Sequence, residues 1–235
     1  DLFRTNPNQH VKIETWNNMP TAAGLSSSSS GLSALVKAAN ELFQVGKTQS
    51  ELAQIAKFAS GSSSRSFFGP LAAWDKDSGE VYQVETDLKL AMIMLVLTDQ
   101  KKPVSSRDGM KLCTETSTSF PEWIKQSEQD YKDMLGYLKT NDFQAVGELT
   151  EANALRMHQT TSTANPPFSY LTDASYQAMD KVKALRASGE RCYFTMDAGP
   201  NVKVLCLEED LDRLADHFRK DYQVIVSRTK ELPDA

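Results

Sequence analysis

A run of hydroxyl side chains precedes a predicted helix near the start of the chain. Five consecutive serines follow Gly24 and Leu25: Ser26, Ser27, Ser28, Ser29 and Ser30. The apolar residues after them recur at spacings of three and four, as in an amphipathic helix: Leu32, Leu35, Val36, Ala39, Leu42 and Phe43. A helix N-terminus carries unpaired N–H groups and a partial positive charge, so this segment suits an anion such as phosphate. It lacks both the lysine of a P-loop and the G-x-S-x-G motif of a hydrolase.

Two later segments combine hydroxyl groups with positive charge. The segment "SGSSSRSFFGP" contains Ser60, Ser62 and Arg65, and a planar guanidinium can form two hydrogen bonds with one phosphate. After the apolar run "LAMIMLVL", four cations lie within eleven residues: Lys101, Lys102, Arg107 and Lys111. This basic segment suits an anionic small molecule, and a solvated loop is the alternative interpretation.

A carboxylate stands at the end of a predicted strand late in the chain. Asp197 follows the strand "RCYFTM" and is close to Gly199 and Pro200. Such an aspartate is often only a turn former. At a strand end, its carboxylate can instead orient or deprotonate a substrate hydroxyl.

Apolar patterns predict the elements that must hold these groups in place. Strands are expected at residues 10–16, 90–97, 191–196, 202–207 and 222–227, and as a pair around the Asp-Ser-Gly turn within residues 71–86. A capping box starts a helix that ends near Ala59: Thr48 followed by Glu51. Helical spacing returns from Gly109 to about Ser188 and again from Glu208 to about Tyr222. In the first of these ranges, three large side chains are expected in the core. Those three residues are Trp123, Tyr131 and Met134.

The order of these elements predicts an α+β fold with two lobes, because the central helical block is segregated from the strands. Residues 1–86 are expected to form a partial N-terminal lobe that contains the serine segment. Residues 87–235 are expected to form a C-terminal lobe with the helical block and the Asp197 turn.

Composition narrows the class of protein. The 235 residues carry a formal net charge of -5, which disfavours nucleic acid and membrane surfaces as partners. Three cysteines without C-x-x-C spacing predict a reducing, cytoplasmic location. The three histidines are scattered without ligand spacing, so no zinc site is expected, and the metal ligands stay unassigned.

Four motifs together resemble one enzyme family. "PTAAGLSSSSSGLSAL", "SGSSSRSFFGP", "KKPVSSRDGM" and "MDAGPNVKV", in this order, are similar to mevalonate diphosphate decarboxylases of the GHMP kinase superfamily, bacterial type. The resemblance implies a two-lobed GHMP-kinase-like fold with the active site in the cleft between the lobes. It also implies that ATP and mevalonate 5-diphosphate give isopentenyl diphosphate, carbon dioxide, ADP and phosphate, with Mg²⁺ assisting.

The resemblance also implies roles for individual residues. Seven would bind the ATP phosphates: Gly24, Ser26, Ser27, Ser28, Ser29, Ser30 and Ser106. Four would bind the substrate diphosphate or its surroundings: Ser60, Ser62, Arg65 and Arg107. Lys102 would contact the phosphoryl group in transfer, and Asp197 would act on the C3 hydroxyl.

The family pattern leaves three further expectations. Family members begin with a segment carrying a Tyr-Trp-Gly-Lys-type motif that is missing here, so the chain is expected to be a truncated member. The family implies a homodimer. The alternatives are a GHMP-family kinase that does not decarboxylate its product and a non-catalytic anion-binding module; release of carbon dioxide and substrate-dependent use of ATP distinguish them.

Overall fold

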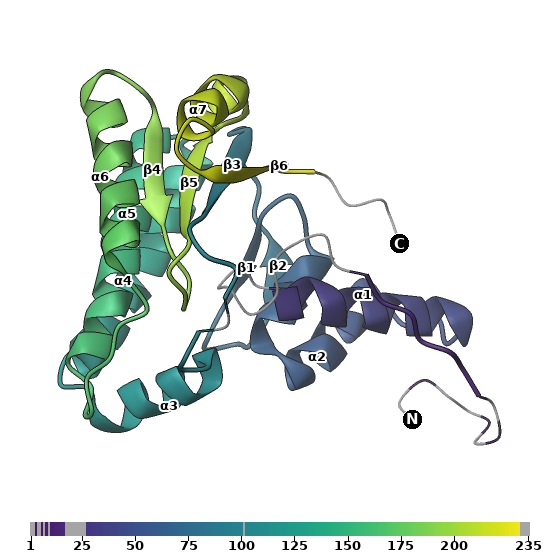
Figure 1. The fold of residues 1–235 in the computed structure, drawn as a ribbon. Coiled ribbons are helices and arrows are strands. Elements are labelled where there is room, and N and C mark those ends of the chain that lie inside the picture. The colour runs from purple at the N-terminus through teal and green to yellow at the C-terminus, as the bar shows by residue number, and fades with distance from the viewer. Residues whose placement is uncertain are drawn as a thin grey trace. The chain divides into compact units, whose positions relative to one another are not determined.

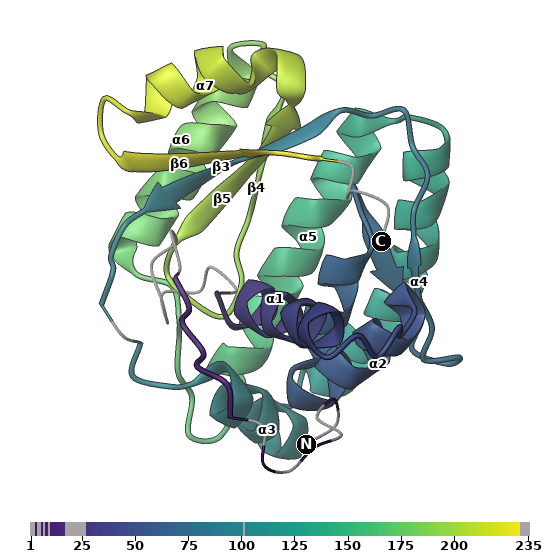
Figure 2. The same ribbon diagram turned by 90° about the vertical axis from the view of Figure 1, so that its right-hand side faces the viewer.

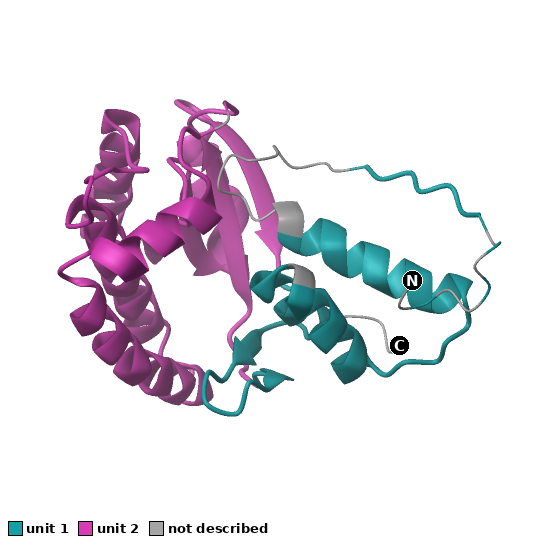
Figure 3. Ribbon diagram, turned by 90° about the horizontal axis from the view of Figure 1, so that it is seen from below, with its two compact units in different colours: residues 1–21, 26–84, 229–235 teal, residues 22–25, 85–228 magenta. Residues whose placement is uncertain are grey.

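A computed structural model describes residues 3, 6, 8, 10–16, 27–100 and 102–230, with only the backbone at Ser27, Ser28 and Ala59. Figure 1 labels the helices and strands in chain order. The chain divides into two compact units, coloured separately in Figure 3. Unit 1 comprises residues 1–21, 26–84 and 229–235, and unit 2 comprises residues 22–25 and 85–228. The predicted lobes, which divide between residues 86 and 87, stay a prediction.

Unit 1 consists of two α-helices, a 3₁₀-helix and a small hairpin. Its elements are α1 (Ser27–Leu42), α2 (Gln49–Ala59), η1 (Gly61–Phe67), β1 (Ala72–Trp74) and β2 (Val81–Gln83). The strands pair antiparallel around a turn that contains Gly79, whose φ of +71° glycine adopts without strain. A small core joins α2 to η1: Leu52, Ala53, Ala56 and Phe67.

Local sequence signals predict both helices of unit 1, but not the start of the first one. The side chain of Thr48 accepts the N–H of Glu51 while Glu51 accepts the N–H of Thr48, which confirms the predicted capping box. Helix α1 begins at Ser27, so it includes most of the serine run that was expected to precede it as a turn. The hydroxyl-rich segment that follows α2 forms the 3₁₀-helix η1, in which the hydroxyl of Ser64 donates to the oxygen of Gly61 and the N–H of Ser63 donates to the oxygen of Ser60.

The prediction of a strand at residues 10–16 is wrong. This segment has no strand partner among the described residues, and Val11, Ile13 and Trp16 are 43%, 62% and 88% exposed. Alternating polarity favours a strand only where a neighbouring strand completes its hydrogen bonds. The segment instead lines one side of an apolar groove of about 390 Å³, opposite side chains of α1 such as Leu35 and Leu42.

Unit 2 is a four-stranded antiparallel sheet with helices packed on it. Its elements are β3 (Leu90–Val96), α3 (Ser106–Thr116), α4 (Phe120–Lys139), α5 (Phe143–Ser162), α6 (Asp173–Ala187), β4 (Cys192–Thr195), β5 (Val202–Leu207), η2 (Glu208–Asp210), α7 (Leu211–Phe218) and β6 (Gln223–Arg228). The strand order is β4-β5-β3-β6, so β3 and β5 are central. Figure 2 shows α5 and α6 behind the strands.

An apolar core joins the sheet to its helices. Ile93 of β3, Val204 of β5 and Phe194 of β4 are fully buried with Val182 of α6 and Phe218 of α7. Ile93 and Phe194 both pair with Val204 in the sheet, so these three side chains share one face. Burial of that face fixes the register of the strands, and therefore fixes where the loops at their ends begin.

Three predictions for unit 2 need correction. Helix α3 starts at Ser106, so Arg107 and Lys111 lie on a helix; the side chain of Ser105 accepts the N–H of Asp108 and caps it. The expected helix from Glu208 to Tyr222 is a short 3₁₀-helix followed by α7. Three residues of α4 that were expected in the core, Trp123, Tyr131 and Met134, are only partly buried. Helix α5 packs against one side of α4 and leaves the other side open.

Two helical glycines predict opposite effects of adding a methyl group. A Cβ at Gly147 of α5 would lie 2.0 Å from the ring of Tyr193, whereas a Cβ at Gly136 of α4 would meet nothing within 4 Å. Gly147→Ala is therefore expected to lower the free energy of unfolding by about 1–3 kcal/mol through overpacking. Gly136→Ala should raise it by roughly 0.5–1 kcal/mol, because alanine favours the helix. Urea denaturation of both variants measures this, and a stabilised Gly147→Ala would contradict the packing described.

Candidate functional site

The serine segment is described only from the start of α1. Gly24 and Ser26 lie outside the described residues, and the side chains of Ser27 and Ser28 are not described. Ser29 is buried, with its Oγ 3.2 Å from Oγ of Ser66, and Ser30 is exposed. The hydroxyl run thus spans the first turn of α1, where backbone N–H groups lack helical partners. Its binding of nucleotide phosphates stays a prediction.

Ser33 joins this helix to the second hydroxyl-rich segment. Its Oγ donates to the backbone oxygen of Ser29 at 2.7 Å and lies within hydrogen-bond distance, 2.9 Å, of the backbone oxygen of Ser63. Both Ser33 and Ser63 are buried. This contact holds η1 against the first turns of α1, so two of the three predicted phosphate-binding segments lie together in unit 1.

Three of the four residues predicted for the substrate diphosphate, Ser60, Ser62 and Arg65, lie at the end of α2 and in η1. Ser60 ends α2, and its Oγ lies 3.3 Å from Oγ of Ser62. Arg65 is exposed, and no ion pair of Arg65 is found within the part of the chain that the structure describes. An exposed guanidinium retains its donors for an anionic ligand.

In unit 2, Asp197 lies where the sequence places it, two residues after β4 ends at Thr195. Its Oδ2 forms an ion pair with Nζ of Lys203, a largely buried lysine on β5. Sequence patterns did not identify Lys203 as a neighbour, because the pairing of β4 with β5 is what brings it there.

Lys102 reaches the same turn from the other side. Its Nζ lies 2.5 Å from the backbone oxygen of Ala198 and 2.5 Å from Oγ of Ser106. Burial lowers the pKa of Lys102, and the negative charge of Asp197 partly opposes this shift. The structure therefore brings together three predicted site residues, Lys102, Ser106 and Asp197. Arg107 is exposed on the first turn of α3, and Lys101 lies outside the described residues.

Lys102 also contacts Tyr170, a residue that the sequence analysis did not identify. Nζ of Lys102 lies 5.1 Å from the centre of its ring, a cation–π distance. The Tyr170 hydroxyl donates to the backbone oxygen of Ser105 at 3.0 Å, which ties it to the N-cap of α3. This approach requires glycine at position 109, where a Cβ would lie 2.2 Å from the Tyr170 hydroxyl. The G of the "SSRDGM" motif was the available signal.

His158 of α5 is a second unpredicted neighbour of Asp197. Its ring is buried, 5% exposed, and packs edge-on against Tyr170 with ring centres 6.3 Å apart. Burial lowers the pKa of His158 from its ordinary value of 6.5 to about 4, although the backbone and the charge of Asp197 oppose the shift. The imidazole is therefore neutral near pH 7 and adds no positive charge beside the carboxylate.

Side chains from the helices hold the edge strand that leads to Asp197. Oε1 of Glu151 accepts the N–H of Phe194 at 3.0 Å, and Arg186 donates to the oxygen of Cys192 at 3.0 Å. Glu151 and Arg186 also form a bidentate pair at 2.7 and 3.0 Å. Edge-strand groups of β4 are thus satisfied internally, which fixes the position at which Asp197 emerges.

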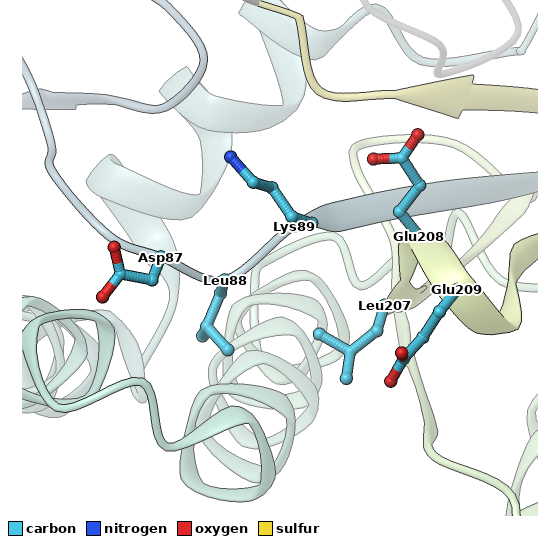
Figure 4. A pocket seen from close by; sticks show the side chains of 6 residues that line it. All are labelled: Asp87, Leu88, Lys89, Leu207, Glu208 and Glu209. Carbon is cyan, nitrogen blue, oxygen red and sulfur yellow. The ribbon is translucent and has the colours of Figure 1, made fainter.

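A pocket at the opposite end of β3 has the wrong charge for phosphate. Figure 4 shows it; it has a volume of about 490 Å³ and is lined by Asp87, Leu88, Lys89, Leu207, Glu208 and Glu209. Three carboxylates against one lysine disfavour an anion. The seven residues of β3 separate this pocket from the end of the strand near Lys102 by about 20 Å. It is therefore separate from the predicted site.

The described residues contain neither a metal-binding cluster nor a membrane-spanning helix. No group of three or more His, Cys, Asp or Glu side chains there is arranged to hold a metal ion. None of the described helices combines the length and apolarity that a membrane span requires.

Comparisons with known proteins identify the family and the fold of this chain. A family model for the "Diphosphomevalonate decarboxylase-like N-terminal domain" matches residues 1–84, and one for the "Mevalonate 5-diphosphate decarboxylase C-terminal domain" matches residues 92–233. The solved structure of mevalonate pyrophosphate decarboxylase from Streptococcus pyogenes is 70% identical, with a TM-score of 0.94, and the match covers all of this chain and 74% of that one. The chain therefore has the mixed α+β fold of these decarboxylases.

More distant relatives agree. Diphosphomevalonate decarboxylase of Candida albicans is 32% identical over 90% of this chain and 61% of its own length. A structure described as "MDDEF in complex with MVAPP, AMPPCP and Magnesium" is 41% identical, with a TM-score of 0.83, over 91% of this chain and 68% of that one. The chain belongs to the diphosphomevalonate decarboxylase family. It spans between 54% and 61% of the length of the first curated relatives.

The depressed pKa of His158 predicts a pH dependence of stability. Between pH 4 and 6.5 the unfolded chain binds a proton at this residue that the folded chain does not, so stability should fall as pH decreases through this window. The expected contribution is about 1 kcal/mol per pH unit. His158→Gln should remove it, whereas His10→Gln, at an exposed position, serves as the control. Denaturant unfolding at pH 4.5, 5.5 and 7.5 measures the slopes, and equal slopes for parent and His158→Gln would refute this assignment.

Proposed function

We propose that the complete protein catalyses the ATP-dependent decarboxylation of mevalonate 5-diphosphate to isopentenyl diphosphate. The observation that carries this proposal is the 70% identity, over the whole chain, with the decarboxylase of Streptococcus pyogenes. The complex of a 41% identical relative with MVAPP, AMPPCP and magnesium supports the same ligands here. Residues 1–86 and 87–235 would belong to two lobes with the active site in the cleft between them.

Phosphate binding is assigned to hydroxyl and N–H groups. The start of α1, with Gly24 and the serines that follow it, would bind the phosphates of ATP together with Ser106. Ser60, Ser62 and Arg65 would bind the diphosphate of the substrate, and Arg107 would add a further positive charge. Phosphoryl transfer requires positioning and charge neutralisation more than covalent help, and these groups provide both.

The donor set of the chain fits Mg²⁺ held mainly by the nucleotide. The described residues contain no cluster of three carboxylates or imidazoles, whereas Mg²⁺ often takes only one or two protein ligands and completes its shell with phosphates and water. Hydroxyls of the serine run, Ser26 to Ser30, would supply the protein ligands. When bound, the ion neutralises phosphate charge during transfer.

Asp197 and Lys102 act at the reacting atoms in this proposal. The carboxylate of Asp197 accepts a hydrogen bond from the C3 hydroxyl and receives or directs its proton as the oxygen attacks the γ-phosphorus. A new O–P bond forms, and the bond to the β-phosphate breaks to release ADP. Lys102, with its three donors beside the Asp197 turn, stabilises the charge on the transferring group.

Loss of carbon dioxide follows from the phosphorylated intermediate. The tertiary C3–O bond breaks, phosphate leaves with the electron pair, and positive charge develops at C3. The electrons of the bond between the carboxylate carbon and C2 then form the C2–C3 double bond, and carbon dioxide departs. Atoms and electrons balance without any oxidant or reductant.

A cytoplasmic location and a homodimeric state complete the proposal. The three cysteines are free and buried, and burial raises the pKa of Cys192 and Cys206 to about 12, as for unreactive thiols of a cytoplasmic protein. We infer a homodimer from family resemblance alone.

Replacing Asp197 tests the proposed chemistry. Asp197→Asn keeps shape and volume but removes the anionic acceptor, so formation of ADP and of carbon dioxide should fall together by about 10²- to 10⁴-fold. Binding of mevalonate 5-diphosphate should persist, because other residues hold its diphosphate. Coupled assays of ADP and carbon dioxide on the complete protein, together with calorimetric titration of the substrate, measure these quantities.

The control is Asp221→Asn, since Asp221 also forms an ion pair with a lysine, Lys181, at a surface position. It should retain parental rates. A fully active Asp197→Asn would return Asp197 to the role of a turn former. Formation of ADP without carbon dioxide by the parent would instead favour the superfamily kinase, and no substrate-dependent use of ATP would favour an anion-binding module.

A further inference from the structure

The side chain of Asn201 is a buried connection between two loops of unit 2. It is 1% exposed and directly precedes β5. Its Oδ1 accepts the backbone N–H groups of Leu97 and Thr98 at 2.7 and 3.1 Å, and its Nδ2 donates to the oxygen of Thr98 at 3.0 Å. One amide side chain therefore satisfies three main-chain groups just after β3 ends.

The backbone alone cannot make this connection. The ladder between β3 and β5 ends with the pair Leu95 and Val202. If the same register continued, Leu97 would face Pro200, which has no N–H to donate. Beyond the ladder, the planar amide of Asn201 makes a different set of bonds: it accepts the N–H groups of Leu97 and Thr98 and donates to the oxygen of Thr98. The strand end is thus held where ordinary pairing stops.

The turn that Asn201 ends also carries Asp197. The hydroxyl of Ser175, in the first turn of α6, donates to the oxygen of Pro200 at 2.7 Å. Lys102 contacts the oxygen of Ala198 in the same turn. The segment from Leu97 to Lys102 and the turn from Asp197 to Asn201 are therefore connected at both ends: at Thr98 through Asn201, and at Ala198 through Lys102.

We propose that Asn201 is a positioning residue that fixes the segment carrying Lys102 against the turn carrying Asp197. It touches no reacting atom in this scheme; it acts through those two side chains. A displacement of about 1 Å lowers the contribution of a reactive group to the rate. Thr98 lies four residues before Lys102 and Asn201 lies four residues after Asp197, so the bonds between Thr98 and Asn201 affect the reaction rate. The kinetic part of this inference rests on the proposed function, whereas the structural part does not.

The first test measures the pKa of Lys102 and does not require turnover. In the complete protein, NMR titration of lysine labelled at Cε, with the signal assigned by Lys102→Arg, should report a pKa below the ordinary value. Asn201→Ala should move this pKa upward toward that value, because the segment loses its anchor and Lys102 becomes more exposed. An unchanged Lys102 titration in a folded Asn201→Ala protein would overturn the inference.

Asn141 provides a matched control in the same unit. Its Oδ1 accepts from the hydroxyl of Thr86 and the N–H of Asp87, both at 3.0 Å, and its Nδ2 donates to the Asp87 carboxylate at 2.9 Å. Asn141→Gly removes an equal set of three hydrogen bonds, and glycine accepts the φ of +57° at this position. It should leave the pKa of Lys102 and the turnover rate unchanged. A similar Lys102 shift in this control would attribute the effect to general loosening.

The second test measures coupling in the rate. Asn201→Asp keeps the oxygen that accepts from Leu97 and Thr98 but replaces the donor to Thr98 with a second oxygen, so it also serves if Asn201→Ala does not fold. We expect kcat to fall by about 10²-fold while the dissociation constant for nucleotide changes little. In a Lys102→Ala background the same change should cost much less, because the residue it positions is gone.

Each outcome of the two tests decides a different claim. Fully additive losses of kcat, or a loss of thermal stability with unchanged kcat well below the melting temperature, would make Asn201 structural only. If the parent protein shows no turnover of mevalonate 5-diphosphate, the proposed function fails. The Lys102 titration then still decides whether Asn201 controls the position of this lysine.

Discussion

The pairing of β3 with β5 is the constraint on which the unit 2 site depends. Six consecutive residue pairs, from Leu90 with Leu207 to Leu95 with Val202, fix the two central strands, and the burial of Ile93 and Val204 makes any other register costly. Lys102 follows the end of one strand and Asp197 precedes the start of the other. A slip of one residue would displace these groups by about 3.4 Å, far more than a phosphoryl transfer tolerates.

The two polar clusters differ in how they are held. In unit 1, hydroxyl groups contact neighbouring backbone over short distances, as Ser33 does between α1 and η1. In unit 2, side chains from several elements contact one turn: Lys102, His158, Ser175 and Lys203. Serine hydroxyls rotate freely and suit the several oxygens of a phosphate chain. A single carboxylate aimed at one hydroxyl requires a more rigid frame, and the sheet provides it.

Local signals predicted most elements of the fold, and long-range contacts explain what was missed. The capping box at Thr48, the apolar run of β3 and the helical spacing of α4, α5 and α6 each act within a few residues, so sequence alone located them. The segment at residues 10–16 failed because a strand needs a partner that its own pattern cannot specify. Asp197 and Lys102 were found through motifs. Their neighbours Tyr170, His158 and Lys203 were not, because only folding brings these residues to the site.

The close approach of α5 to the edge strand has a consequence for how the sequence can vary. Gly147 and Tyr193 are 46 positions apart in the chain, yet the tyrosine ring occupies the space that any side chain at 147 would fill. Tyr193 also stacks on Arg186, the partner of Glu151. Neither residue can change freely while the other stays. Among homologous sequences, a larger residue at the first position should appear only together with a smaller one at the second, a pair that evolves as one unit.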